Sequence, residues 1–238
     1  MDEIRLKQLE QLQERMKYTF CNRALLITSL THKSYINENP LTGASDNERM
    51  EFLGDAVLGL CISDLLMKKH ADLDEGALSQ IRALLVREKP LAELAAKLGL
   101  GECLLLGRGE ENSGGRQKES LLANALEALI AAVYLDSSFS KAKSFINRLM
   151  APLLEDEILL TECVDYKTML QEVCHKKYKS PPIYTLLSES GPDHDKMFEV
   201  EVSVGNSIRQ TGWGKSKKEA QKQAAQKAWR YLQSENCS

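Results

Sequence analysis

The spacing between apolar residues changes once along this chain, and that change constrains the fold more than any other feature of the sequence. From about residue 3 to residue 150, apolar residues recur three and four positions apart, as at Phe52, Ala56 and Leu60. This spacing places them on one face of an α-helix. From Phe198 to Val204 apolar and polar residues alternate instead, which is the pattern of a half-buried strand. The sequence therefore predicts an all-α domain followed by a small α+β domain.

A short acidic segment separates the two patterns. Residues 151–163 (APLLEDEILLTEC) are the predicted linker, so the domains are expected at 1–150 and 164–233. The second domain is predicted to run helix, strand, strand, strand, helix (α-β-β-β-α). Its expected parts are a helix over VDYKTMLQEVCHKKY, a strand from Ile183 to Leu187, a strand ending at Val204, a two-residue hairpin at Gly205–Asn206, a returning strand from Ser207 to Trp213, and a helix opened by a capping box at Ser216–Glu219.

Two features of composition bear on function. Residues 1–163 hold 19 Lys and Arg against 25 Asp and Glu, whereas residues 164–233 hold 12 against 8. A small basic domain often binds a polyanion, although an excess of this size also arises by chance. The polar, glycine-rich residues 107–120 are expected to form a mobile loop.

Composition also excludes several classes of protein. The longest mostly apolar run, Leu121 to Leu135, is shorter than the roughly 20 residues of a membrane span. The N-terminus lacks the apolar segment of a signal peptide. Six cysteines and four histidines are dispersed without a C-x-x-C pair. This distribution argues against a zinc knuckle or a disulfide framework and favours a reducing, cytoplasmic location.

Three carboxylates recur on one face of a predicted helix. Glu48, Glu51 and Asp55 are spaced i, i+3 and i+7, which keeps them within an arc of about 60°. Like charges stacked in this way repel one another and cost helix stability. Taken alone, the pattern is also that of a solvated acidic face.

A second segment carries acidic and amide groups inside an apolar helix. Asn124 and Glu127 lie in SLLANALEALIAAVYL, and Lys and Arg are absent from residues 119–140. A helix that is apolar on all sides is buried, so Glu127 needs a partner or must lose its charge. A neutral acid, a distant arginine, or a divalent cation shared with the 48–55 face would each satisfy it. Oxygen ligands favour Mg²⁺ or Mn²⁺, ions that assist phosphodiester hydrolysis.

Lysines gather where the last helix is predicted to begin. Lys215, Lys217 and Lys218 surround its N-terminus, where the helix dipole is already positive. An anion lying across the helix start would explain this placement, and a solvated lysine run is the alternative.

The segment NERMEFLGDAVL, residues 47–58, resembles the signature of ribonuclease III, the endonuclease specific for double-stranded RNA. The likeness covers nearly the whole chain. It includes LLITSLTHKSY (25–35), DEGALSQIRALLV (74–86), LGRGEENSGGRQKESLLANALEALIAAVYLD (106–136), and the GPDH (191–194) and KSKKEAQKQAA (215–225) of a double-stranded-RNA-binding domain. The resemblance implies a homodimer that needs Mg²⁺ (Mn²⁺ may substitute), no small-molecule cofactor and no membrane. It also implies products with 5′-phosphate and 3′-hydroxyl ends and a short 3′ overhang, and a role in processing precursor rRNA and other structured transcripts.

The resemblance assigns roles in the first domain residue by residue. Glu51, Asp55 and Glu127 match the metal-binding carboxylates, with Asp55 and Glu127 central to catalysis. Two further glutamates, Glu48 and Glu75, match positions that support the catalytic site. Phe52 matches an aromatic residue that inserts into the partner subunit.

In the second domain the resemblance assigns contacts to A-form RNA. Thr168, Gln171 and Glu172 share one helix face and match positions that contact the minor groove, as does His194. The lysines at 215, 217 and 218 match positions that contact phosphates.

Asn124 departs from the family pattern, which usually has aspartate there. An amide oxygen still ligates Mg²⁺ but brings no charge, so a weaker metal site is expected. This departure allows one rival interpretation, a double-stranded-RNA-binding dimer whose nuclease site is weakened or inactive. A more distant rival, which does not depend on Asn124, is a helical metallo-phosphohydrolase that acts on nucleotides, with the C-terminal domain as an unrelated adaptor.

Overall fold

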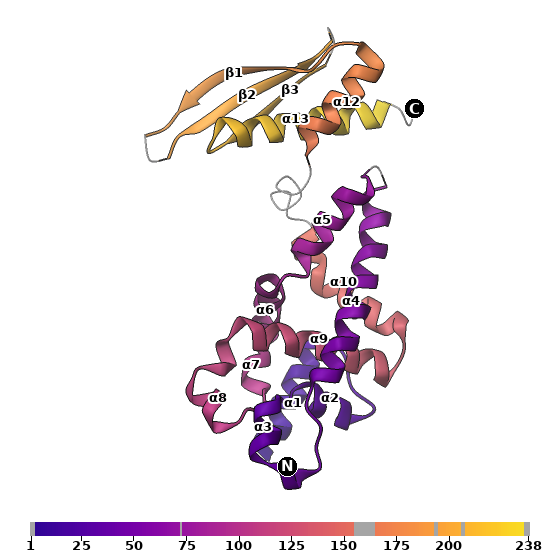
Figure 1. Ribbon diagram of the computed structural model, residues 1–238, viewed down its shortest axis with the longest axis vertical. Helices are drawn as coiled ribbons and strands as arrows, with labels where there is room; N and C mark the ends of the chain where they lie inside the picture. Colours follow the sequence, from indigo (N-terminus) through magenta and orange to yellow (C-terminus); the bar gives the residue numbers. More distant parts are fainter. Residues whose placement is uncertain (1–2, 72, 155–164, 193–194, 206–207, 236–238) are drawn as a thin grey trace. The chain divides into compact units, whose positions relative to one another are not determined.

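The computed structural model describes residues 3–71, 73–154, 165–192, 195–205 and 208–235. The chain divides into two compact units, Met1–Ala71 with Arg82–Glu155 and Asp72–Ile81 with Asp156–Ser238 (Figure 1). Up to residue 154 the described regular elements are α-helices and two short 3-10 helices, so the predicted helical domain is confirmed. They are α1 (Glu3–Met16), α2 (Arg23–Ser29), α3 (Lys33–Glu38), η1 (Pro40–Thr42), α4 (Glu48–Lys69), α5 (Glu75–Leu85), α6 (Glu88–Lys97), α7 (Leu100–Cys103), α8 (Arg108–Asn112), η2 (Gly115–Gln117), α9 (Glu119–Asp136) and α10 (Phe139–Leu154).

The core of the first unit is built around α9. Its side chains from Leu122 to Val133 are buried on most sides, as predicted for a helix without a polar face. Helices α4, α6, α2 and α10 pack against it. Glu127 lies on α9, so its carboxyl group is packed among these neighbouring helices.

The remaining elements form the predicted α-β-β-β-α arrangement. They are α12 (Tyr166–Tyr178), β1 (Ile183–Ser190), β2 (Met197–Val204), β3 (Ile208–Gly214) and α13 (Lys217–Glu235). The strands form one antiparallel sheet in the order β1-β2-β3, and α13 packs on β2, β3 and α12 (Figure 1). Val200, Val202 and Val204 are buried, which confirms the predicted alternation along β2.

Some boundaries differ from those predicted. Helix α10 continues through Pro152 to Leu154, so the first four residues of the predicted linker are helical. Pro152 has no N–H to donate to the carbonyl of Arg148, so the helix lacks one hydrogen bond two residues before its end. Strand β1 extends to Ser190, because a register shift between Leu186 and Ser188 interrupts its alternation without ending it.

The connection between β2 and β3 is longer than the predicted two-residue hairpin. Val204 pairs with Ile208, which leaves three residues between the strands, the first being Gly205 at φ +56°. Asn206 and Ser207 lie outside the described residues.

The predicted capping box is confirmed at the start of α13. The Glu219 backbone N–H donates to Ser216 Oγ at 3.2 Å, and the Glu219 carboxylate accepts from the Lys215 backbone N–H at 2.8 Å.

Within the described residues, no helix is both long and apolar enough to span a bilayer.

Candidate active site

The three predicted carboxylates of α4 occupy its first two turns. Glu48 begins the helix and is exposed, Glu51 is partly buried, and Asp55 is exposed. Glu48 and Glu51 also lie in the first turn, where the positive end of the helix dipole stabilises negative charge. This partly offsets the repulsion among the three groups.

Helix α4 crosses α9 in direct backbone contact at Gly54. A Cβ atom built on Gly54 would overlap the backbone carbonyl of Glu127, so any larger residue would force the helices apart. The close crossing sets Glu51 and Asp55, which flank Gly54, beside Glu127. Gly54 is not among the site residues predicted from the sequence. A glycine inside an apolar helix is nevertheless a signal of close packing.

Glu127 is partly buried where the two helices meet. Burial, followed by the charges of Asp55 and Glu51, raises the pKa of Glu127 to about 7. The structure thus brings together carboxylates separated by more than 70 residues in the chain. The sequence leaves open three ways to offset the buried charge of Glu127. With the side chains of the chain alone, the raised pKa favours the first of them, the neutral acid.

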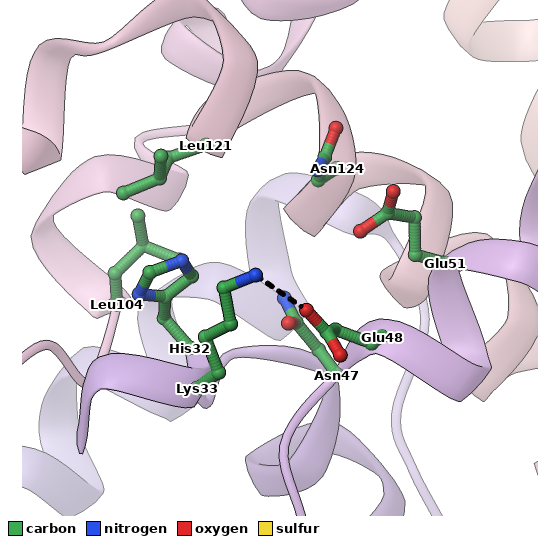
Figure 2. A pocket seen from close by; sticks show the side chains of 8 residues that line it. All are labelled: His32, Lys33, Asn47, Glu48, Glu51, Leu104, Leu121 and Asn124. Carbon is green, nitrogen blue, oxygen red and sulfur yellow. Dashed lines mark hydrogen bonds and ion pairs between the residues drawn. The ribbon is translucent and has the colours of Figure 1, made fainter. Parts of the chain in front are cut away.

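Asn124 lies one helical turn before Glu127, and its side chain lies next to Glu51 in the lining of a small pocket (Figure 2). Burial and the charge of Glu48 raise the pKa of Glu51, whereas Lys33 and a hydrogen bond with Asn124 lower it. The pocket has a volume of about 50 Å³, enough for a few water molecules. It is lined by His32, Lys33, Asn47, Glu48, Glu51, Leu104, Leu121 and Asn124.

Lys33 is a pocket residue that the sequence analysis did not single out. Its ammonium lies 2.8 Å from Glu48 Oε1, and the two side chains are 58% and 54% exposed (Figure 2). The hydrogen bond and the charge of Lys33 hold the pKa of Glu48 below its usual value. Glu48 is therefore already paired, unlike Glu51 and Glu127, whose environments favour the protonated form.

The donor set of this cluster suits a hard cation. The candidate ligands are the carboxylates of Glu51, Asp55 and Glu127 and the amide oxygen of Asn124, all of them oxygen donors. In the described part of the chain, no three His, Cys, Asp or Glu side chains lie close enough together to form a ready-made metal site. Burial, followed by the charges of neighbouring carboxylates, raises the pKa of Glu51 and of Glu127, and a bound divalent cation would favour their charged forms. The chemistry of the donor set fits such an ion.

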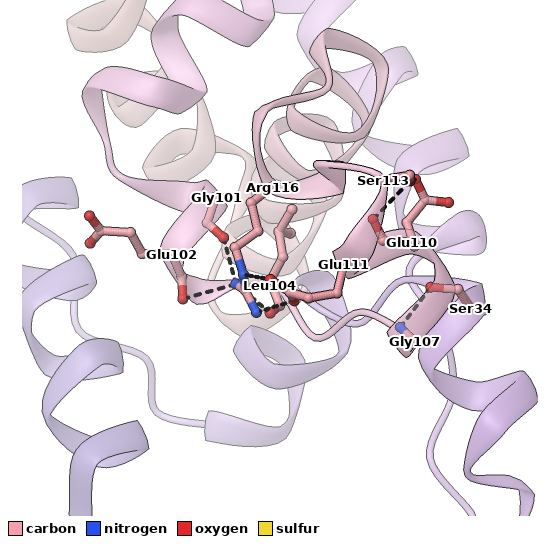
Figure 3. Close-up of polar contacts among 9 residues, drawn as sticks. All are labelled: Ser34, Gly101, Glu102, Leu104, Gly107, Glu110, Glu111, Ser113 and Arg116. Carbon is pink, nitrogen blue, oxygen red and sulfur yellow. Dashed lines mark hydrogen bonds and ion pairs between the residues drawn. The ribbon is translucent and has the colours of Figure 1, made fainter.

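The glycine-rich residues 107–120, expected to be a mobile loop, are mostly helical. They form α8 and η2 and the start of α9. Arg116 donates to the carbonyls of Gly101 and Leu104 at 2.8 and 3.1 Å and pairs with both carboxylate oxygens of Glu111 at 2.6 Å (Figure 3). This network ties the segment before α9 to the end of α7. The predicted loop is wrong because hydrogen bonds to carbonyls outside the segment, those of Gly101 and Leu104, hold it in a helical conformation.

Glu75 is the first residue of α5 and is exposed. Its carboxylate accepts a hydrogen bond from Ser79 Oγ at 3.0 Å. It belongs to the second compact unit, whereas the α4–α9 cluster belongs to the first. The role of Glu75 at the site stays a prediction.

The predicted minor-groove residues of α12 share one exposed face. Thr168, Gln171 and Glu172 are all exposed, and Thr168 Oγ1 donates to the N-cap residue Asp165 at 2.8 Å. Thr168 thus also stabilises the start of the helix. His194, the fourth predicted contact, lies outside the described residues.

The three predicted phosphate contacts lie at the start of α13 and are exposed. Lys215 Nζ is 3.5 Å from Asp195, and Lys217 Nζ lies 5.7 Å from the centre of the Phe198 ring. Lys218 is the second residue of α13. Because the Lys215–Asp195 pair is exposed, a phosphate would compete with Asp195 at little cost.

Comparison with known proteins places both units in one family. The family model described as Ribonuclease-III-like matches residues 22–153, and the double-stranded RNA binding motif matches residues 166–232. Ribonuclease 3 of Syntrophobacter fumaroxidans is 46% identical over 234 residues, which cover 97% of each chain. Ribonuclease 3 of Borreliella burgdorferi is 45% identical over 232 residues, 98% of this chain and 94% of the relative.

Solved structures agree with these matches for the first unit. The crystal structure of the nuclease domain of ribonuclease III from Campylobacter jejuni has a TM-score of 0.58 at 42% identity. The match covers 66% of this chain and 99% of that domain. The fold, the acidic cluster and the second unit all lead to one conclusion. The chain belongs to the ribonuclease III family, as an endoribonuclease that joins a helical nuclease domain to a double-stranded-RNA-binding domain.

Proposed function

We propose that this chain hydrolyses double-stranded RNA at the carboxylate cluster where α4 crosses α9. The observation that carries the proposal is Glu127, whose pKa is raised to about 7 by burial and by Asp55 and Glu51. Carboxylates gathered where one of them is partly buried are costly to the fold, and such a cost is typical of a functional site. The expected domains are 1–150 for catalysis, 151–163 as linker and 164–233 for duplex binding.

Glu51, Asp55, Asn124 and Glu127 would hold Mg²⁺, with Mn²⁺ as a substitute. When bound, the ion supplies an activated water and neutralises charge on the phosphate and the leaving 3′-oxygen. Glu127 would have to lose its proton to act as a ligand, and Asp55 and Glu51 would hold the ion from the facing helix α4. By resemblance to the family, Glu48 and Glu75 support the site. The products would carry 5′-phosphate and 3′-hydroxyl ends, with a short 3′ overhang.

The second domain would recognise the duplex by its shape. Thr168, Gln171 and Glu172 on α12, with His194, would contact ribose groups in the minor groove. Lys215, Lys217 and Lys218 would contact phosphates beside the start of α13. Such contacts read A-form geometry rather than base sequence, so cleavage would depend on RNA structure.

The active form would be a homodimer that pairs through α4. The side chains of Phe52, Leu60 and Met67 are 80%, 58% and 66% exposed. Their spacing of eight and seven residues places them along one side of α4, and large apolar side chains are seldom exposed together in this way. A related structure from Campylobacter jejuni concerns a region involved in dimer formation of the nuclease domain. With two sites, each subunit would cut one strand of the duplex.

The natural substrates would be precursor rRNA and structured messenger and transfer RNA precursors, and the work would take place in the cytoplasm. Duplex RNA in a cell arises mainly in such folded transcripts. Among the described residues, Cys61, Cys103 and Cys174 are buried and Cys21 is exposed, and none of the four forms a disulfide with another described cysteine.

A metal-titrated cleavage assay on a labelled RNA duplex tests the proposal. Wild-type protein is expected to cut the duplex with Mg²⁺ or Mn²⁺, and Glu127→Gln is expected to cut at least about 10²-fold more slowly while binding equally well. Binding without cleavage at every metal concentration would instead favour a duplex-binding protein with an inactive site. Faster hydrolysis of mononucleotides than of duplex RNA would favour a nucleotide phosphohydrolase.

A further inference from the structure

One cation lines the pocket beside the candidate metal ligands. Of the eight residues that line it, all within the described part of the chain, Lys33 carries the only ammonium or guanidinium group. It is the first residue of α3, and His32 caps that helix. The ammonium is therefore placed by a helix end rather than by a long flexible segment.

The pair between Lys33 and Glu48 is held loosely. Both side chains are more than half exposed, and exposed ion pairs contribute only about 0–1 kcal/mol to stability. An ion pair this weak can exchange partners with an incoming anion. Its geometry, at 2.8 Å between Nζ and Oε1, nevertheless fixes where the ammonium lies in the absence of that anion.

An RNA phosphate approaching this cluster meets strong repulsion. Glu48, Glu51, Asp55 and Glu127 all present carboxyl groups on two adjoining helices. The protein would need a positive group of its own to hold the substrate backbone in register while the metal ligands act. Lys33 has the charge, the exposure and the position for this role.

We propose that Lys33 contacts a phosphate of the bound RNA strand beside the cleavage site, and that Glu48 positions Lys33 rather than serving as a metal ligand. This inference rests on the proposed function. On substrate binding, Lys33 exchanges its hydrogen bond with Glu48 for one with a phosphate oxygen. No covalent step is involved, and Lys33 keeps its proton throughout.

The test compares Lys33→Ala, Lys33→Arg and Glu48→Gln with Lys68→Ala as the matched control. Lys68 lies on α4 in an exposed pair with Asp64, so its replacement removes the same charge away from the pocket. Single-turnover cleavage of a plain RNA duplex is measured against RNA concentration and, separately, against Mg²⁺ concentration. Lys33→Ala is expected to raise the half-saturating RNA concentration about tenfold, the effect of losing about 1.4 kcal/mol. Lys33→Arg is expected to restore most of the affinity, and Lys68→Ala to change little.

The double variant separates positioning from metal binding. If Glu48 acts through Lys33, Glu48→Gln changes the half-saturating RNA concentration in the wild-type chain but not in Lys33→Ala. The Mg²⁺ dependence then stays unchanged in both backgrounds. A higher Mg²⁺ requirement for Glu48→Gln would make Glu48 a metal ligand and overturn its assignment as a positioning residue.

A binding measurement gives a readout independent of catalysis. In the Glu127→Gln background, Lys33→Ala is expected to lower the slope of log affinity against log salt by just under one, the value for one lost phosphate contact. If wild-type protein cleaves duplex RNA but Lys33→Ala alters neither the half-saturating RNA concentration nor this slope, the inference fails and the proposed function stands. If wild-type protein does not cleave duplex RNA, both fail.

Discussion

At Glu127, burial and two neighbouring carboxylates act in the same direction, and the consequence is a dependence on pH. The pKa of Glu127 is about 7 in the folded chain, compared with 4.5 for an unperturbed glutamate. Without metal, the folded state therefore binds an extra proton between these pH values, and its stability falls as pH rises from about 4.5 to 7. Metal binding requires the deprotonated form, so the affinity for Mg²⁺ should fall as pH drops below 7.

Calorimetry checks both parts of this prediction. Glu127→Gln should raise the melting temperature of metal-free protein at pH 8 by roughly 2–4 °C and change it little at pH 4.5. Titration of Mn²⁺ into wild-type protein should give weaker binding at pH 6 than at pH 8. Equal affinity at the two pH values would show that Glu127 does not ligate the ion.

Asn124 gives a second prediction at a single residue. Asn124→Asp adds a charged oxygen ligand beside Glu51, so the half-saturating Mg²⁺ concentration for cleavage should fall about tenfold. Without metal, the added charge should raise the pKa of Glu51 and Glu127 further and destabilise the fold. Asn124→Ala is the useful comparison, because it removes the ligand and should raise the Mg²⁺ requirement. An unchanged Mg²⁺ requirement in both variants would exclude position 124 from the metal site.

The sequence predicts the acidic residues of the site better than it predicts their neighbours. Glu127 stands out because charge inside an apolar helix has few explanations, whereas Glu51 and Asp55 become a site only through the family resemblance. Lys33 does not stand out, because its importance depends on its contact with Glu48 at the start of α4, a tertiary relationship that local pattern cannot reveal. Gly54 is similar, since only the crossing with α9 makes its missing side chain necessary.

At the scale of elements, the crossing of α4 and α9 controls the geometry of the cluster. Gly54→Ala should destabilise the protein by about 1–3 kcal/mol and weaken cleavage, because the added methyl group overlaps the Glu127 carbonyl. Gly59→Ala is the control on the same helix, since nothing lies within 4 Å of its added Cβ. Within one subunit it should stabilise the helix by up to about 1 kcal/mol, so the two variants should differ in the sign of their effect on stability. Denaturant melts give the unfolding free energy of each variant, and cleavage assays give its rate. If Gly54→Ala is as stable and as active as Gly59→Ala, the close contact at Gly54 is not needed for stability or cleavage.

Long elements are predicted well and short ones poorly for a physical reason. Helices such as α4 and α9 follow from periodicity over many residues, which averages out local exceptions. Helices α8 and η2 instead depend on Arg116 and Glu38, whose hydrogen bonds reach carbonyls and N–H groups elsewhere in the chain. The composition of this segment shows only polar residues and glycine, so the sequence by itself predicts a mobile loop.

For the whole molecule, the uneven charge of the two domains predicts how RNA binding responds to salt. Removing residues 164–238 should weaken duplex binding and reduce its salt dependence, because fewer phosphate contacts release fewer counterions. Duplex affinity measured from low to moderate salt in the full and shortened chains provides the test. A shortened chain with the full salt slope would contradict the assignment of Lys215, Lys217 and Lys218.

Helix α4 bears Glu48, Glu51 and Asp55 and, along the same helix, the exposed apolar side chains of Phe52, Leu60 and Met67. If subunits pair through these side chains and pairing holds α4 in its active position, we expect activity to depend on self-association. Turnover per subunit should then be lowest in very dilute enzyme and climb to a plateau as concentration increases. The rate law would be second order in protein at one extreme and first order at the other.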